Sequence, residues 1–239
     1  MTGMQIAPYQ DFARRVLGFE FTNINYLITA LTHRSYVNEH KKSVSEHNER
    51  LEFLGDAVLE LVVTDFLFKN YDEPEGILTS WRSSLVRTES IGEAGESLGY
   101  EPLIRMSRGE KNGSVRARQQ ILANAFEAVV GAIYLERGYA DTAEFIHKYI
   151  TAKLDTIVES GSWRDPKSQL QEVSQRIDNQ TPAYKVIEEI GPDHDKIFTI
   201  GAFVGTTLMG QGTGPSKQIA QQEAARSALQ AYDERQKTD

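Results

Sequence analysis

Several carboxylates stand in an otherwise apolar stretch of the chain, between residues 47 and 62. At about 100° of rotation per helical residue, Glu49, Glu52, Asp56 and Glu60 fall within an arc of roughly 80°. Apolar side chains fill the rest of the circumference: Leu51, Phe53, Leu54, Val58, Leu61 and Val62. This pattern predicts an acidic stripe on a buried helix. Carboxylates crowded together in low dielectric must be protonated or bind a cation, and a cluster of hard oxygen ligands suits Mg²⁺ or Mn²⁺.

A second polar pair lies in the apolar segment 121–135, where Asn124 and Glu127 stand at i and i+3 on one helix face. Small residues in the same segment would let this helix approach a neighbour closely: Ala123, Ala125, Ala128, Gly131 and Ala132. Two such helices side by side would place Glu52 and Asp56 opposite Asn124 and Glu127. A buried polar pair satisfied by hydrogen bonds explains the same residues, so the residues alone leave both the metal site and this structural alternative open.

The elements that would position these residues are helical nearly throughout from Phe12 to about Val158, which predicts an all-α domain over residues 1–158. Residues 159–162 are small and polar and are followed by Asp165 and Pro166, which predicts a short linker over 159–164 and then a helix start. From residue 165 to 235 the pattern changes to α-β-β-β-α, which predicts a small α+β domain. Its strands are expected at 183–189, 196–204 and 206–214 and its helices at 167–176 and 217–232, with a frayed end after Asp233.

Composition excludes several classes of site. The chain has 239 residues and no cysteine, which rules out disulfides, thiolate zinc sites, iron–sulfur clusters and a cysteine nucleophile. No apolar run is long enough for a membrane span, and no secretory signal is visible, so we expect a cytoplasmic protein without a membrane partner. The net charge is −8 and neither half is basic overall, so any binding of nucleic acid must depend on local patches.

The segment Asn48–Leu59, with the sequence NERLEFLGDAVL, resembles the signature of the ribonuclease III endonuclease domain. Three further motifs stand in the order of that family: Ala30–Ser35 before this segment, Glu75–Thr79 after it, and then the Ala123–Leu135 helix. The resemblance implies divalent-metal hydrolysis of double-stranded RNA by a homodimer, with Mg²⁺ as the cofactor and Mn²⁺ as a substitute. It also implies products with 5′-phosphates and short 3′ overhangs, and a role in rRNA and mRNA processing.

The resemblance assigns roles to single residues. Glu52, Asp56, Asn124 and Glu127 match the metal ligands. Two further acidic residues, Glu49 and Glu75, match positions that line the catalytic site, and Phe53 matches an aromatic residue that docks in the partner subunit.

Asn124 departs from the family pattern, because most members have Asp at this position. An amide offers a neutral oxygen in place of a negative charge, so the number of ligands can survive while the affinity for Mg²⁺ falls. Three interpretations stay open: a working natural variant, an engineered inactivation and a natural pseudoenzyme. The alternative to an active nuclease is therefore a catalytically impaired dimer that binds double-stranded RNA.

The second domain resembles a double-stranded RNA-binding domain from Asp165 to Leu229. Ser168, Gln171 and Gln175 share one helix face and offer polar groups suited to the shallow minor groove of A-form RNA. A solvated helix face would explain that spacing equally well. The resemblance adds the remaining candidate RNA-binding residues: His194, Ser216, Lys217, Gln218 and Gln221.

Two of these candidates bear on binding strength and on the class of ligand. Ser216 is expected to cap a helix whose first turn, with Lys217, holds a phosphate. Gln218 and Gln221 replace lysines that are common in this motif, so binding should be weaker and depend less on salt. The glycines from Gly210 to Gly214 lack the ending of a P-loop, so no nucleotide cofactor is expected. An unrelated helical phosphohydrolase with an appended domain remains a third class.

Overall fold

The computed structural model describes residues 3–192 and 196–238, so His194 lies outside the described residues. The chain divides into two compact units, Met1–Trp163 and Arg164–Asp239, each of which has its own core. Each unit is described by itself below. The boundary between the units falls inside the predicted linker, although the last helix of the first unit continues to Ser160.

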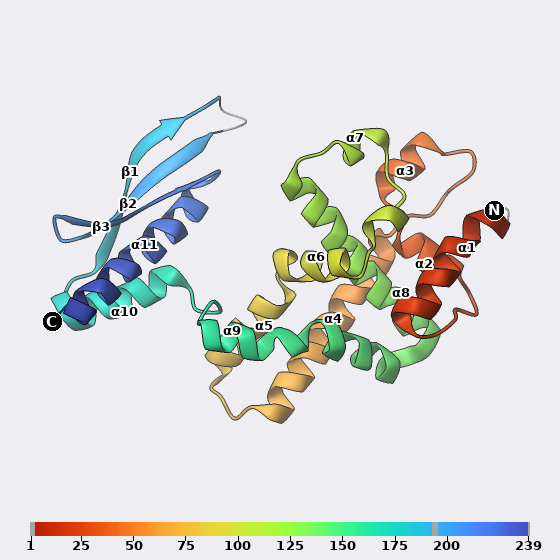
Figure 1. Ribbon diagram of the computed structural model, residues 1–239, viewed down its shortest axis with the longest axis horizontal. Helices are drawn as coiled ribbons and strands as arrows, with labels where there is room; N and C mark the ends of the chain where they lie inside the picture. The colour runs from red at the N-terminus through yellow and green to blue at the C-terminus, as the bar shows by residue number, and fades with distance from the viewer. Residues whose placement is uncertain (1–2, 193–195, 239) are drawn as a thin grey trace. The chain divides into compact units, whose positions relative to one another are not determined.

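The first unit is built from helices, as predicted (Figure 1). Its α-helices are α1 (Gly3–Phe12), α2 (Asn25–Ala30), α3 (Arg34–Glu39), α4 (Glu49–Asn70), α5 (Glu75–Val86), α6 (Thr88–Ser97), α7 (Arg108–Lys111), α8 (Val115–Tyr149) and α9 (Leu154–Ser160). Short π- or 3₁₀-helical turns at Ala13–Leu17, Glu101–Leu103 and Thr151–Lys153 connect some of them. Gly138 has a positive φ of 78° and kinks α8, and the chain then turns back toward α9.

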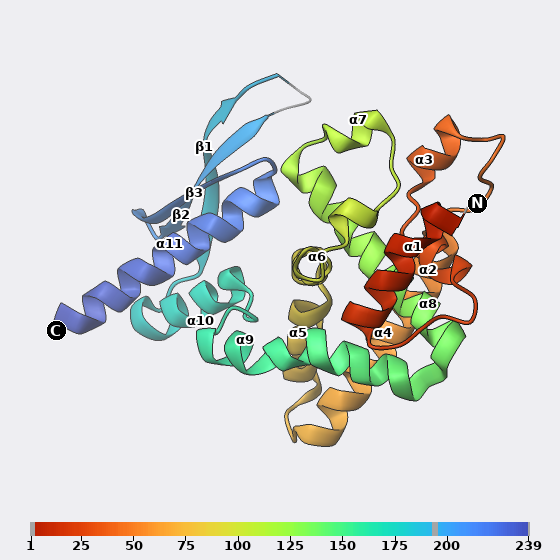
Figure 2. The same ribbon diagram turned by 45° about the vertical axis from the view of Figure 1, so that its right-hand side comes forward.

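Helices α4 and α8 lie against each other at the centre of the unit, in both views (Figures 1 and 2). Glycine makes this approach possible. A Cβ atom on Gly55 would lie 1.7 Å from the carbonyl oxygen of Glu127, and one on Gly131 would lie 2.3 Å from that of Leu51. These distances are far inside van der Waals contact, so the two backbones touch where α4 and α8 cross.

The core side of α4 consists of buried apolar residues and Gly55: Leu51, Val58, Leu59, Val62, Val63 and Leu67. The expectation that the whole helix is buried was wrong. Phe53 is 81% exposed, and Leu61 and Phe68 are 57% and 78% exposed, so one apolar face of α4 has no cover within the described chain. The acidic residues at positions 49 and 56 are exposed as well, because the stripe lies at the edge of the α4–α8 contact.

The second unit has the predicted α-β-β-β-α order: α10 (Pro166–Asp178), β1 (Pro182–Ile190), β2 (Ile197–Val204), β3 (Thr207–Gly214) and α11 (Lys217–Thr238). The strands form one antiparallel sheet in the order β1-β2-β3. Helix α11 packs on this sheet through small residues, since a Cβ on Gly210 or Gly212 would lie 2.2 Å from the backbone nitrogen of Ala228 or Ala224. Helix α11 continues beyond its predicted end at residue 232 and reaches Thr238.

Candidate active site and nucleic-acid interface

The candidate active site forms where α4 crosses α8. Glu52 and Asp56 lie on either side of Gly55 on α4, and the backbone of Glu127 rests directly on that glycine. The crossing brings Glu127 close enough for the charges of Glu52 and Asp56 to act on its carboxylate.

The electrostatics of the cluster follow from this crowding. Burial first, and then the nearby carboxylates of Asp56, Glu52 and Glu60, together raise the pKa of Glu127 to about 8. The pKa of Glu52 is also raised, first by burial and then by Glu49 and Asp56. Like charges this close are unfavourable unless a proton or a cation is present.

The two ends of the acidic stripe are neutralised, and the middle is not. Arg34 Nη1 lies 3.1 Å from Glu49 Oε1, and Arg82 Nε lies 3.1 Å from Glu60 Oε2. Among the described residues, no ion pair or side-chain hydrogen bond forms to Glu52, Asp56 or Glu127. Sequence reasoning missed both arginines, which are far from their partners along the chain and carry no helix-periodic signal.

Asn124 lies on α8 one turn before Glu127 and is half-buried. Its Oδ1 accepts a hydrogen bond of 2.7 Å from Nε2 of Gln120. The oxygen that would act as a metal ligand is therefore already an acceptor, a contact that the sequence did not suggest.

Glu75 does not join the cluster within one chain. It is the first residue of α5 and is exposed, and its carboxylate accepts a hydrogen bond of 3.2 Å from Thr79 Oγ1. Glu49 is closer to the site, since it contributes to the raised pKa of Glu52. Phe53 faces away from the core and is available for another contact.

The donor set is compatible with a divalent cation. It consists of carboxylate oxygens and one amide oxygen, the ligands that hard cations prefer. In this conformation, no group of three Asp, Glu or His side chains within the described ranges stands as a finished metal site. The raised pKa of Glu127 shows that positive charge added beside it would stabilise its ionised form.

In the second unit, Ser168 and Gln171 from α10 and Gln218 from α11 line one open groove of about 380 Å³. Lys167 and Tyr184 line the same groove, and Lys167 Nζ lies 5.0 Å from the centre of the Tyr184 ring. Gln175 lies further along α10, where its Nε2 donates to Asn179 Oδ1 at 2.8 Å. The structure thus gathers three of the predicted residues and adds a lysine that the sequence analysis did not select.

The start of α11 holds the other candidates. Ser216 Oγ accepts a hydrogen bond of 3.3 Å from the backbone nitrogen of Ile219, which confirms the predicted N-cap. Lys217 Nζ lies 3.2 Å from Glu189 Oε1, so its charge is already paired. Gln221 Oε1 accepts a hydrogen bond of 2.7 Å from Lys167 Nζ and so ties α11 to α10.

Comparisons with known proteins agree with this arrangement. A family model described as ribonuclease-III-like matches residues 23–154, and one described as a double-stranded RNA binding motif matches residues 166–232. The two matches fall within the two units of the structure.

Curated relatives match nearly the whole chain. Ribonuclease 3 from a Streptococcus pneumoniae strain is 41% identical over 92% of this chain and 95% of its own length. Ribonuclease 3 from Desulforamulus reducens is 42% identical over 90% of this chain and 87% of its own length.

A solved structure matches the first unit. The nuclease domain of ribonuclease III from Campylobacter jejuni, described for flexibility in the region involved in its dimer formation, has a TM-score of 0.51 and 42% identity. It covers 58% of this chain and 96% of its own. Helices of the length and apolarity needed to cross a membrane are not found among the described residues. The fold, the paired domains and these relatives show that the chain belongs to the ribonuclease III family, the divalent-metal-dependent endoribonucleases that cleave double-stranded RNA.

Proposed function

We propose that Mg²⁺, with Mn²⁺ as a substitute, is the ion of this endoribonuclease, and that Glu52, Asp56, Asn124 and Glu127 hold it. The observation that carries this proposal is that three carboxylates crowd at the α4–α8 crossing and none of them has a positive partner among the described residues. A divalent ion bound there would activate a water for in-line attack on phosphorus and stabilise the leaving 3′ oxygen.

The residues of the chain have distinct tasks in this proposal. Glu127, whose pKa is about 8, holds a proton at neutral pH and must release it before it can bind a cation. Glu52 and Asp56 supply negative charge from one side of the crossing, and Glu49 lines the edge of the site. The close contact of Gly55 with the Glu127 backbone fixes the spacing of these groups.

The proposed active form is a homodimer. The exposed Phe53 supports this proposal, because a side chain that is 81% exposed in one chain gains stability when a second chain covers it. We propose that Glu75 joins the site only in that dimer, because within one chain its carboxylate accepts a hydrogen bond from Thr79.

The second unit is proposed to bind the RNA duplex through Ser168, Gln171, Gln175 and Gln218, with Ser216, Lys217 and Gln221 at the start of α11. His194 keeps its proposed role on the resemblance alone. The proposed domain limits are 1–158 and 165–235, and the proposed setting is the cytoplasm, in rRNA and mRNA processing.

The second candidate function is a duplex-binding dimer with impaired catalysis. The hydrogen bond from Gln120 to Asn124 Oδ1 favours it, because this oxygen must then serve two partners. One experiment separates the two functions: the wild-type chain and the Asn124→Asp variant are incubated with long double-stranded RNA and either Mg²⁺ or Mn²⁺.

Cleavage by the wild type, leaving 5′-phosphates and short 3′ overhangs, supports the active enzyme. Cleavage only after Asn124→Asp would instead establish the impaired dimer. Cleavage by neither protein would contradict the proposed metal ligands, provided that both proteins still bind duplex RNA in a gel-shift assay.

A further inference from the structure

The acidic stripe on α4 is paired with arginine at both ends, and its middle forms no ion pair within the described part of the chain. Glu49 and Glu60 are the outer members, and their partners Arg34 and Arg82 come from α3 and α5. Glu52 and Asp56 are the inner members, beside Glu127. The two arginines therefore neutralise the carboxylates on each side of the α4–α8 crossing and leave the carboxylates at the crossing itself without a cationic partner among the described residues.

Arg82 is fixed by two contacts on α4. Its Nε lies 3.1 Å from Glu60 Oε2, and its Nη1 donates to Thr64 Oγ1 at 3.1 Å. The Thr64 hydroxyl in turn donates to the backbone oxygen of Glu60 at 2.7 Å. The guanidinium is thus held in one orientation with its charge on Glu60, rather than free to approach Asp56.

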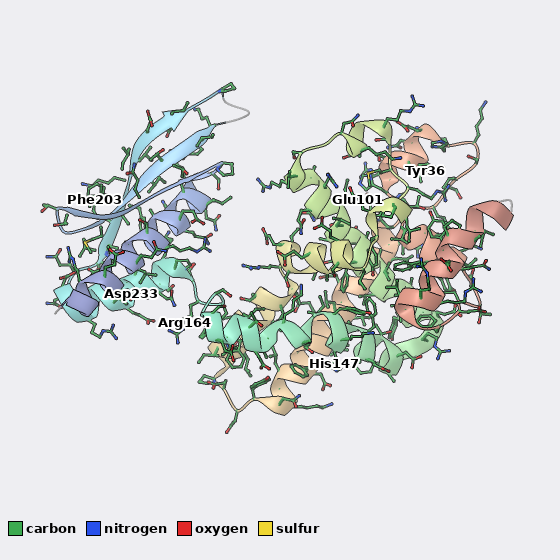
Figure 3. All side chains as sticks on the ribbon, in the orientation of Figure 1. Tyr36, Glu101, His147, Arg164, Phe203 and Asp233 are labelled. Atoms are coloured by element: carbon green, nitrogen blue, oxygen red, sulfur yellow. The ribbon has the colours of Figure 1, made fainter. Side chains whose placement is uncertain are left out.

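Arg34 is held through the position of its helix. Tyr36 of the same helix, labelled in Figure 3, has the Arg105 guanidinium 4.3 Å from the centre of its ring. Backbone hydrogen bonds of 2.8 Å from His33 to Arg105 and of 2.9 Å from Asn48 to Thr32 join the start of α3 to both neighbouring segments. Arg34 therefore starts from a fixed backbone next to the first turn of α4, although its side chain is exposed.

A carboxylate left unpaired beside a metal site is itself a ligand for cations. Without Arg82, Glu60 would present a free carboxylate one helical turn from Asp56, and its charge already reaches Glu127. Without Arg34, Glu49 would likewise present a free carboxylate close to Glu52. A cation could then be shared between an outer and an inner carboxylate, away from the crossing point.

We propose that Arg34 and Arg82 are positioning residues that confine the divalent cation to Glu52, Asp56 and Glu127 by occupying the two outer carboxylates. This inference rests on the proposed metal site. It makes a prediction that a merely structural role does not make: removing either arginine should strengthen or add cation binding and at the same time slow cleavage.

The test measures Mn²⁺ binding by electron paramagnetic resonance on the full chain without RNA, alongside kcat on double-stranded RNA. Arg82→Gln should gain a Mn²⁺ site or bind Mn²⁺ about 3- to 10-fold more tightly, since one negative charge has been freed nearby. Its kcat should fall by about 10-fold or more, because cation placement is lost. The double variant Arg82→Gln with Glu60→Gln should return Mn²⁺ binding to the wild-type value and recover most of kcat.

Arg34→Gln tests the same idea where folding is not at stake, because this side chain is 65% exposed. Its Mn²⁺ binding should also tighten through the freed Glu49. The matched control is Arg14→Gln, which breaks an exposed pair with Glu20 (3.4 Å) and should change neither Mn²⁺ binding nor kcat.

Three results would overturn the inference: unchanged Mn²⁺ binding in both arginine variants, a parallel loss of Mn²⁺ binding and kcat, or failure of Glu60→Gln to restore Arg82→Gln. Absence of Mn²⁺ binding by the wild type would instead overturn the proposed metal site. The two failures are therefore distinguishable in one set of measurements.

Discussion

Close contacts through glycine build both units of the chain, but the side chains beside those contacts differ in kind. In the first unit, Gly55 and Gly131 bring two helices together, and the carboxylates next to the crossing are crowded and partly desolvated. In the second unit, Gly210 and Gly212 bring a strand against α11, and three of the candidate RNA-binding side chains line an open groove.

The difference reflects what each ligand requires. A divalent cation is held by charges that cannot relax away from one another, so the site gains from burial and a rigid backbone. An RNA duplex is read across a wide surface by groups that stay accessible. Lys217 is paired with Glu189, whereas Lys167 donates to the neutral amide of Gln221 and so keeps its positive charge beside the groove.

The largest expected effect separates the two surfaces. Glu127→Gln should reduce cleavage by more than about 100-fold, beyond the loss typical of a group that only supports a ligand. Binding of duplex RNA in a gel-shift assay without divalent metal should be unchanged. The control is Glu144→Gln, an exposed residue on the same helix, which should cleave like the wild type. Cleavage by Glu127→Gln at the wild-type rate would show that Glu127 is not a metal ligand of the catalytic site.

Two alanine substitutions compare how much the close contacts at Gly55 and at Gly212 contribute to stability. Gly55→Ala should cost about 3 kcal/mol or more of unfolding free energy, because its Cβ would overlap the Glu127 backbone. Gly212→Ala should cost a similar amount in the second unit, at the contact with Ala224.

Activity should then separate the two variants. Gly55→Ala should lose cleavage and keep duplex binding, and Gly212→Ala should lose duplex binding first. Denaturant titrations measure the stability. Gly76→Ala, where an added Cβ would meet open space, is the control and should be close to neutral. Equal behaviour of all three variants would contradict the crossing as the origin of the site.

The unpaired carboxylates predict a pH dependence of stability in the first unit. The pKa of Glu127 is about 8 in the folded chain, against an ordinary value of 4.5. Between these values the folded state holds a proton that the unfolded state has lost, so stability falls as pH rises from about 5 to 8. The loss should be about 2 kcal/mol, discounted because the group is only half-buried.

Urea unfolding in EDTA at several pH values measures this trend. Glu127→Gln should flatten it, and a saturating divalent cation should reverse it, since binding releases the proton. A wild-type curve that is already flat in EDTA would show that the three carboxylates do not interact as described.

The smallest expected effect concerns the charges of the second unit. Gln218→Lys combined with Gln221→Lys should steepen the dependence of log Kd on log salt by about 0.9 for each new phosphate contact. Lys217→Ala should make the dependence shallower by about the same amount. Binding titrations from low to moderate salt measure both slopes, with kcat at saturating RNA as the control. Unchanged slopes would place the start of α11 outside the RNA contact.

Much of this arrangement is predictable from the sequence, because it depends on local periodicity. The spacing of Glu52 and Asp56 fixes their shared face on α4, and Asn124 and Glu127 share a face in the same way. Small residues in the second segment indicated a close approach, and the contact at Gly131 confirms it. Strand and helix patterns likewise predicted the order of elements in the second unit.

Other features depend on residues far apart in the chain. The contacts of Arg82 with Glu60 and of Lys167 with Gln221 could not be predicted, because side-chain pairing across elements leaves no periodic signal in the sequence. The prediction that all of α4 is buried was wrong. An apolar residue such as Phe53 indicates that its side chain favours burial, but not whether its own chain or another chain covers it.

The sequence by itself determined the two domains, the acidic stripe and the oxygen ligands available to a cation. Only the tertiary structure decided which of those carboxylates remain unpaired, since that depends on where α3, α5 and α8 bring their side chains. The physical reason is that helix periodicity sets the face on which a residue lies, whereas charge balance and desolvation arise from all the elements that meet at that face.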